Sequence, residues 1–252
     1  MLNPPLTAAL VLGSLFGAAT LGIRLRARLP EHHLSDETKE AVRIGMGSVA
    51  TMAALVLGLL VASTKSAYDT EKAEVIQMSA KVTYLDQLLA NCGPPAAESR
   101  EVLQRGMRSA LLRIWPEAEV GQGTPAPASV WSQDLPQAIQ RIATSDDAQR
   151  TFKSQAASLA NELGQMRWLL FEQMESSISV PLLLIMVFWL ALTFISVGLF
   201  APPNGTVITA QFLAALSVAG AIFLILELDQ PFDGLVKISS HPMVNALKHL
   251  AI

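Results

Sequence analysis

The chain has 252 residues, of which 51% are hydrophobic and only 15% are charged, and its mean hydropathy is +0.40. This balance is typical of an integral membrane protein with a modest water-exposed part. The net charge of -3 argues against a nucleic-acid-binding protein, and the single cysteine, Cys92, excludes an internal disulfide framework and a cysteine-rich metal site.

Two uncharged runs near the start of the chain predict membrane-spanning helices. Leu6–Ile23 is about 18 residues long and Ile44–Ser63 about 20, enough to cross the hydrocarbon core of a bilayer at about 1.5 Å per residue. A secretory signal carries its positive charge before the apolar run, whereas Arg24, Arg26 and Arg28 follow this one. We therefore expect a retained first span.

The second span is predicted to continue beyond the bilayer as one helix. No stop signal follows Ser63, and apolar residues then recur in the steps of a coiled-coil seam until Asn91-Cys92-Gly93-Pro94-Pro95 ends the helix. A second seam runs directly into the third span. The first seam is Tyr68, Val75, Met78, Val82, Leu85 and Leu89, and the second is Phe152, Ala156, Leu159, Leu163, Met166, Leu170 and Met174.

Two long helices that leave and re-enter the same side of a membrane most simply pack together as an antiparallel stalk. Any two amphipathic helices would show such seams, so the alternative that each seam packs against a different helix is not excluded. Between the seams we expect helices around Val102–Ile114, ending at Trp115-Pro116, and around Leu135–Ile142. Glu117–Val130 is predicted to be a loop, and Ser145-Asp146-Asp147 to cap the long helix ahead.

The last two spans are Val180–Phe200 and Val207–Leu226, joined by a short uncharged turn. The tail must then lie on the side of the helical domain, where Met243, Val244, Leu247 and Leu250 predict a final amphipathic helix that packs on it. The predicted fold class is therefore all-α, an integral membrane protein with four transmembrane helices. Residues 1–63 hold the first two spans, 64–179 a helical extramembrane domain continuous with spans two and three, 180–226 the last two spans, and 227–252 the tail.

The membrane orientation follows from the positive charges. Arg24, Arg26 and Arg28 favour a cytoplasmic loop after the first span, which places the helical domain outside the cytoplasm. Positively charged residues, mostly lysines, on the other side of the membrane nearly equal these arginines in number. The charge distribution therefore favours this orientation only weakly. Cys92, expected at the far tip of the stalk, should distinguish the two orientations by its reaction with an impermeant thiol reagent.

Enzyme signatures are missing from the sequence. It contains no P-loop, no G-x-S-x-G, no H-E-x-x-H and no G-x-G-x-x-G, so we expect neither catalysis nor a bound cofactor. Adjacent side chains such as His32-His33 point apart on a helix or strand, and we interpret this pair as part of a solvated loop rather than a metal site.

The second span is rich in small residues, and two interpretations remain open. Pairs such as Gly47–Thr51 and the series Ala54–Gly58–Ala62 suit close helix–helix packing. Alternatively, one face of the helix lines a pore, with a thinly polar wall, an apolar constriction and a cation at its mouth. That face contains Ser48, Thr51, Leu55, Gly58, Ala62 and Lys65.

Two carboxylates, Glu227 and Asp229, follow the fourth span without a break. A carboxylate at the edge of the hydrocarbon normally has a partner, and Lys65 ends the second span on the same side. We therefore predict an ion pair of Lys65 with Glu227 or Asp229, the alternative being that both acids reach the headgroup water.

The stretches GMGSVATMAALVLGLLVASTKSAYD and FLILELDQPFDGLVKISS, together with LPEHHLSDETKEAVR and RIWP, resemble the bestrophin-like domain family of bacterial membrane proteins. Its motif after the last span includes Pro231, Phe232 and Gly234. More distantly, the chain is similar to bestrophins, which are pentameric anion channels with four membrane helices and a pore lined by the second. The resemblance implies a multi-pass protein of the bacterial inner membrane, with neck-like positions among Leu55, Gly58 and Leu59.

Two hypotheses of different classes follow. The first is a homo-oligomeric ion channel, five copies being the number implied by the distant relation to bestrophins, with the second helix lining the pore and anions favoured. Its partners would be the lipid bilayer, further copies of the chain and small inorganic ions. The second is a non-conducting scaffold or sensor whose helical domain binds a partner.

Overall fold

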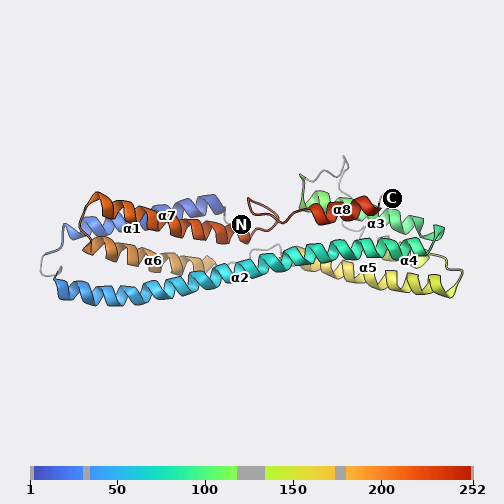
Figure 1. Ribbon diagram of the computed structural model, residues 1–252, viewed down its shortest axis with the longest axis horizontal. Helices are drawn as coiled ribbons and strands as arrows, with labels where there is room; N and C mark the ends of the chain where they lie inside the picture. The colour runs from blue at the N-terminus through green and yellow to red at the C-terminus, as the bar shows by residue number, and fades with distance from the viewer. Residues whose placement is uncertain (1–2, 31–34, 118–133, 174–179, 251–252) are drawn as a thin grey trace. The chain divides into compact units, whose positions relative to one another are not determined.

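The computed structural model describes residues 3–30, 35–117, 134–173 and 180–250, and in this part of the chain it contains eight α-helices and one short 3₁₀ helix (Figure 1). The predicted all-α class is confirmed. Helices α1, α2, α6 and α7 are long and apolar enough to cross a membrane. His32-His33, Met174 and most of the loop Glu117–Val130 lie outside the described residues. The elements are α1 (Pro4–Arg26), α2 (Asp36–Asn91), η2 (Pro94–Ala96), α3 (Ala97–Ile114), α4 (Leu135–Arg141), α5 (Asp147–Gln173), α6 (Val180–Phe200), α7 (Gly205–Leu228) and α8 (His241–Leu250).

The chain divides into two compact units. The membrane unit comprises Met1–Tyr68 and Ser176–Val236, and the helical unit comprises Asp69–Glu175 and Lys237–Ile252. The helix α2 is continuous through this division, as the sequence predicts for the second span and its seam. The predicted seam residues of α2 beyond Tyr68 therefore belong to the helical unit.

Side-chain caps explain where several helices begin. The hydroxyl of Ser35 accepts the N–H of Thr38 at 3.3 Å before α2, and a carboxylate oxygen of Asp146 accepts the N–H of Gln149 at 2.7 Å before α5. The amide oxygen of Asn204 serves α7 in the same way, accepting the N–H of Val207 at 2.9 Å. Each bond satisfies a backbone donor that has no partner within the helix.

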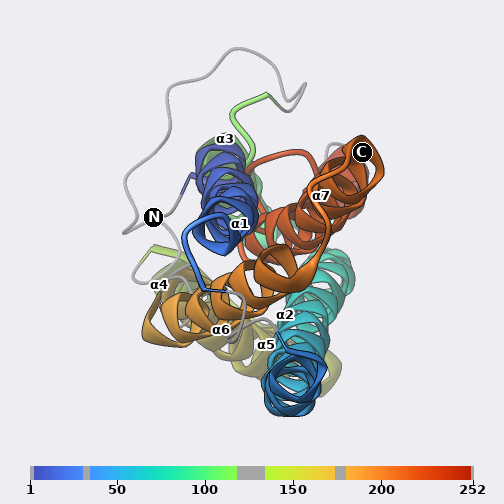
Figure 2. The same ribbon diagram turned by 90° about the vertical axis from the view of Figure 1, so that its left-hand side faces the viewer.

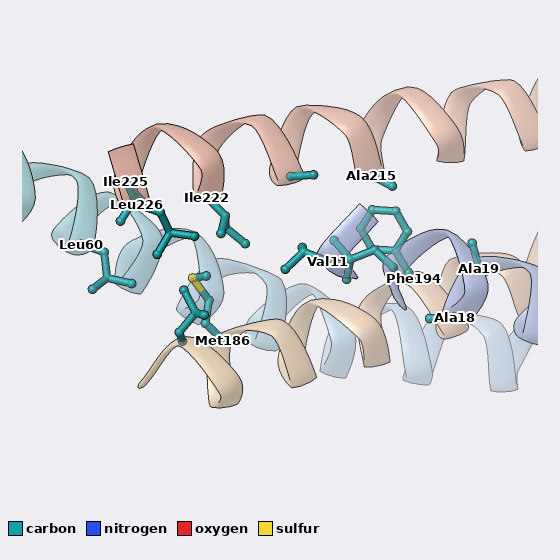
Figure 3. Packing of buried hydrophobic residues seen from close by; sticks show 13 residues of the cluster. Val11, Ala18, Ala19, Leu60, Met186, Phe194, Ala215, Ile222, Ile225 and Leu226 are labelled. Atoms are coloured by element: carbon teal, nitrogen blue, oxygen red, sulfur yellow. The ribbon is translucent and has the colours of Figure 1, made fainter. Parts of the chain in front are cut away.

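The core of the membrane unit is built around α1. This helix contacts α6 and α7, and α2 lies beside α6, as the view along the unit shows (Figure 2). The largest fully buried side chains are Leu15 of α1, Met186 of α6 and Ile222 and Ile225 of α7, and Leu60 brings α2 into the same cluster (Figure 3).

Glycines bring α1 and α6 unusually close together. A Cβ atom added to Gly22 would collide with the backbone carbonyl of Ile195, and one added to Gly198 would collide with that of Ala19. The guanidinium of Arg26 also donates to the carbonyl of Ala201 at the end of α6. Small residues allow membrane helices to approach in this way because no side chain separates the backbones.

In the helical unit, α2 and α5 pack along the predicted seams. Val75, Val82, Leu85 and Leu89 of α2 are at most 1% exposed. Tyr68, Phe152 and Met166 are half-buried, and the remaining described residues of the α5 seam are buried. Two contacts fix the direction: Lys81 bonds Glu162 at 2.7 Å, and the Cys92 thiol at the end of α2 lies 4.0 Å from the carbonyl of Gln149 at the start of α5. The two helices therefore run antiparallel here.

The other helices of this unit complete its core. Asp86 of α2, a buried carboxylate, accepts two bonds from the guanidinium of Arg100 on α3, at 2.7 and 2.9 Å. The predicted tail helix is confirmed as α8, which contacts α3 and buries Met243, Leu247 and Leu250. The hydroxyl of Ser79 on α2 donates to the carbonyl of Pro242 at 2.8 Å and holds the start of α8.

Candidate functional site

The predicted pore-lining residues all lie on one exposed face of α2. Apart from the adjacent Gly58 and Leu59, they follow one another at three or four residues, which places them on the same side of the helix, and each of them is exposed in the single chain. Leu55 is 70% exposed and Leu59 68%. The residues are Ser48, Thr51, Leu55, Gly58, Leu59, Ala62 and Lys65.

Helix α2 is the least covered of the four spans within the chain. Exposed side chains on α6 are large and apolar, such as Leu184 and Phe188, as expected for a helix that faces lipid, whereas α7 exposes Thr209 and Ser217 as well as Leu213. Those on α2 include many small residues, and only 11% of its apolar window is buried, against 22 to 28% for the other three spans. The exposed small residues are Gly45, Gly47, Ser48, Thr51, Ala54, Gly58, Ala62 and Ser63.

Close packing of the α2 glycines does not occur within the single chain. A Cβ atom added to Gly45, Gly47 or Gly58 would meet no other atom within 4 Å. The hydroxyls of Ser48 and Thr51 donate to the carbonyls of Ile44 and Gly47 in the same helix, at 3.4 and 2.9 Å. The face is therefore open, weakly polar and interrupted by the leucines.

Lys65 ends this face at the limit of the uncharged run. Its side chain is exposed, and its ammonium lies 5.3 Å from the ring centroid of Tyr68, one turn further along α2. This cation–π distance keeps the lysine close to its own helix.

The segment after α7 is organised by the carboxylate of Glu227. This side chain is 3% exposed, and its Oε2 accepts the N–H of Leu235 at 2.6 Å and that of Val236 at 3.4 Å. Gly234 has a φ of +80°, and a Cβ atom there would lie 2.5 Å from the same Oε2. Glycine is therefore required twice, for its conformation and for the space that it leaves. Pro231 and Phe232 are buried beside it.

These contacts give the family motif a structural role. The Glu227 carboxylate closes the chain after α7 into a fixed turn, a role that sequence reasoning missed because the acceptor and its donors are eight and nine residues apart. Pairing of Lys65 with Glu227 or Asp229 stays a prediction. No group of three or more potential metal ligands gathers among the described residues.

Directly after this turn, the chain is held by the end of α3. The indole N–H of Trp115 donates to the carbonyl of Ile238 at 2.8 Å, and the ammonium of Lys237 lies 2.8 Å from a carboxylate oxygen of Glu117. The hydrogen bond from Lys237 and its charge lower the pKa of Glu117. Trp115, Lys237 and Ile238 belong to stretches that carry the family resemblance, but sequence alone does not join residues 120 or more positions apart.

Cys92 is unsuitable for the proposed labelling test. We expected its thiol at an accessible tip, whereas the structure buries it completely at the end of α2. Burial raises the pKa of this thiol, because the charged thiolate would lose its hydration. A buried and protonated thiol reacts poorly with an impermeant reagent.

Comparison with known families covers nearly the whole chain. The profile of the bestrophin-like domain matches residues 13–243, a span that includes the exposed face of α2, Trp115 and the turn at Glu227. Comparison with curated proteins gives no match. The chain is thus a multi-pass membrane protein with four candidate spans, and it belongs to the bestrophin-like domain family.

Proposed function

We propose that the chain forms a homo-oligomeric ion channel in the bacterial inner membrane, with α2 lining the pore. The observation that carries this proposal is that α2 is the span least covered within the chain, with 11% of its apolar window buried, and that its exposed face is rich in small and hydroxyl side chains. Lipid tails pack well against large apolar side chains, whereas small residues in membranes gather where helices or water approach closely. In this arrangement α2 and α5 extend from the bilayer as an antiparallel stalk.

The geometry supports a narrow, gated passage. At least three copies of α2 around an axis are needed to enclose a pore. Leu55 and Leu59, the most exposed leucines of α2, would then form apolar rings of the kind that close a channel by excluding water. Passive conduction needs no catalytic residue, and we propose none.

Anions are the favoured ions. Lys65 places an exposed positive charge at the mouth. Glu227, one of the two acids predicted to pair with Lys65, is 3% exposed and directs its carboxylate to backbone N–H groups. Its negative charge is therefore directed away from the mouth, and the anion preference in this proposal depends on Lys65.

A scaffold or sensor is the second candidate. It is favoured by two exposed side chains of α2 in the helical unit, Ile76 at 49% and Tyr84 at 51%. Aromatic and aliphatic anchors of this kind suit a protein partner. A scaffold functions as a monomer or dimer, whereas a pore requires at least three copies.

The deciding experiment records single-channel currents from the purified full-length protein in a planar bilayer under a salt gradient. We expect discrete currents whose reversal potential lies close to the equilibrium potential of the anion. The variant Lys65→Glu should shift the reversal potential toward the equilibrium potential of the cation. Replacement of Leu55 by alanine should raise the open probability. Silence from inserted protein that is monomeric or dimeric would contradict the channel and support the scaffold.

A further inference from the structure

A groove on the membrane unit lies between α2 and α6. It has a volume of about 610 Å³ and is lined by the first turns of α2 and the last turns of α6. This volume lies within the range of about 300–1,000 Å³ that is usual for small-molecule sites. The groove belongs to the flank of α2 beside the proposed pore face and contains none of the predicted pore residues.

The lining changes from charged to apolar along the groove. Arg43 directly precedes the uncharged run of α2, so it lies at headgroup depth, as does Phe200 at the end of α6. Ala50 and Thr193 lie about 10 Å deeper at 1.5 Å per residue, within the hydrocarbon. A groove with this orientation opens to the bilayer at both depths, and a lipid can enter it sideways.

The charges at the wide end alternate in sign. Asp36 and Lys39 bond each other at 2.9 Å. Glu40 and Arg43 also line the groove, and among the described residues neither has a hydrogen-bond or ion-pair partner. Within this part of the chain they are one exposed anion and one exposed cation, one helical turn apart, and they match the ammonium and phosphate of a zwitterionic headgroup.

We propose that the groove binds one phospholipid with a primary-amine headgroup of the phosphatidylethanolamine type. Its phosphate lies on Arg43, its ammonium on Glu40, and one acyl chain runs along Gly47 and Ala50 against Val197 and Thr193. The lipid stabilises the position of α2 against α6, which otherwise share an unfilled space. This proposal does not depend on ion conduction.

The test is native mass spectrometry of the full-length protein titrated with dioleoyl phosphatidylethanolamine or dioleoyl phosphatidylglycerol. Gly47→Leu fills the groove, and Gly45→Leu is the matched control, because an added Cβ atom has open space at both positions but only Gly47 lines the groove. We expect one tightly held ethanolamine lipid per chain in the wild type and in Gly45→Leu, and about tenfold weaker binding in Gly47→Leu.

Charge variants test the headgroup. Glu40→Gln should remove the preference for the ethanolamine lipid, because the variant loses the charge-assisted bond to the ammonium. Arg43→Gln should weaken the binding of both lipids about tenfold, because the variant loses the charge-assisted bond to the phosphate. Equal binding in all variants would overturn the proposal. So would a change in subunit count in Gly47→Leu with lipid binding unaltered, since the occupant would then be a second copy of the chain.

Discussion

Glu227 shows how one side chain can fix a turn that no local pattern predicts. Its carboxylate sits at the C-terminal end of α7, where a negative charge is unfavourable next to the helix dipole. The hydrogen bonds from the N–H groups of Leu235 and Val236 offset this unfavourable interaction, because each N–H donates to a charged acceptor that is largely buried. The turn therefore depends on Gly234, which alone leaves room for the carboxylate.

Gly234→Ala should destabilise the protein by about 1–3 kcal/mol, because alanine is strained at a φ of +80° and its Cβ atom would displace Glu227. Thermal unfolding in detergent measures this as a lower Tm. The matched control is Gly164→Ala in α5, where an added Cβ atom meets nothing within 4 Å, and there we expect an unchanged or higher Tm. An equal change in Tm in the two variants would contradict the stabilising role of the turn.

The helices themselves follow closely from periodicity, whereas their cross-connections do not. Steps of three and four residues located the seams of α2 and α5, because burial of a helix stripe repeats along the chain. The contact of Gly22 with α6 and the bond from Trp115 to Ile238 join segments that are far apart in sequence. From sequence, the small residues of α2 are consistent with close helix packing and with a pore lining. In the structure the glycines of this face contact no other helix of the same chain.

The indole of Trp115 should contribute strongly to the contact between the end of α3 and the tail. Trp115→Phe keeps an aromatic ring but leaves the buried carbonyl of Ile238 without its donor, which we expect to lower stability by about 1–3 kcal/mol. Hydrogen exchange of the α8 amides should then accelerate, since the tail helix opens more often.

The control for this change is Trp168→Phe on α5, where the side chain is 65% exposed and should be replaced without effect on α8. Unchanged exchange of α8 in Trp115→Phe would show that the tail is held by its other contacts instead.

The close approach of α1 and α6 predicts a strong difference between two glycines of one helix. Gly22→Ala should destabilise by about 1–3 kcal/mol, because its Cβ atom would strike the backbone of Ile195. Gly17→Ala, five residues earlier on α1, has open space and should be neutral. Thermal unfolding of both variants in the same detergent compares them, and a neutral Gly22→Ala would exclude this packing.

The side of the membrane on which the helical unit lies is a property of the whole molecule. Because Cys92 is buried, we place the probe next to it: Ala90→Cys in a Cys92→Ala background, at an exposed position of α2. If the helical unit is outside the cytoplasm, an impermeant maleimide should label this cysteine in intact spheroplasts. Labelling only after lysis would reverse the orientation predicted from Arg24, Arg26 and Arg28.

The central claim is that copies of α2 enclose a pore with the face that each single chain leaves exposed. The most direct measurement is block of the current by a charged thiol reagent in single-cysteine variants along α2, all in the Cys92→Ala background. We expect block at Thr51, Leu55, Leu59 and Ala62, and none at Ala53 and Leu60, which are buried within the chain. Block at the buried positions as well as the exposed ones would contradict the claim, and so would the absence of block at every exposed position.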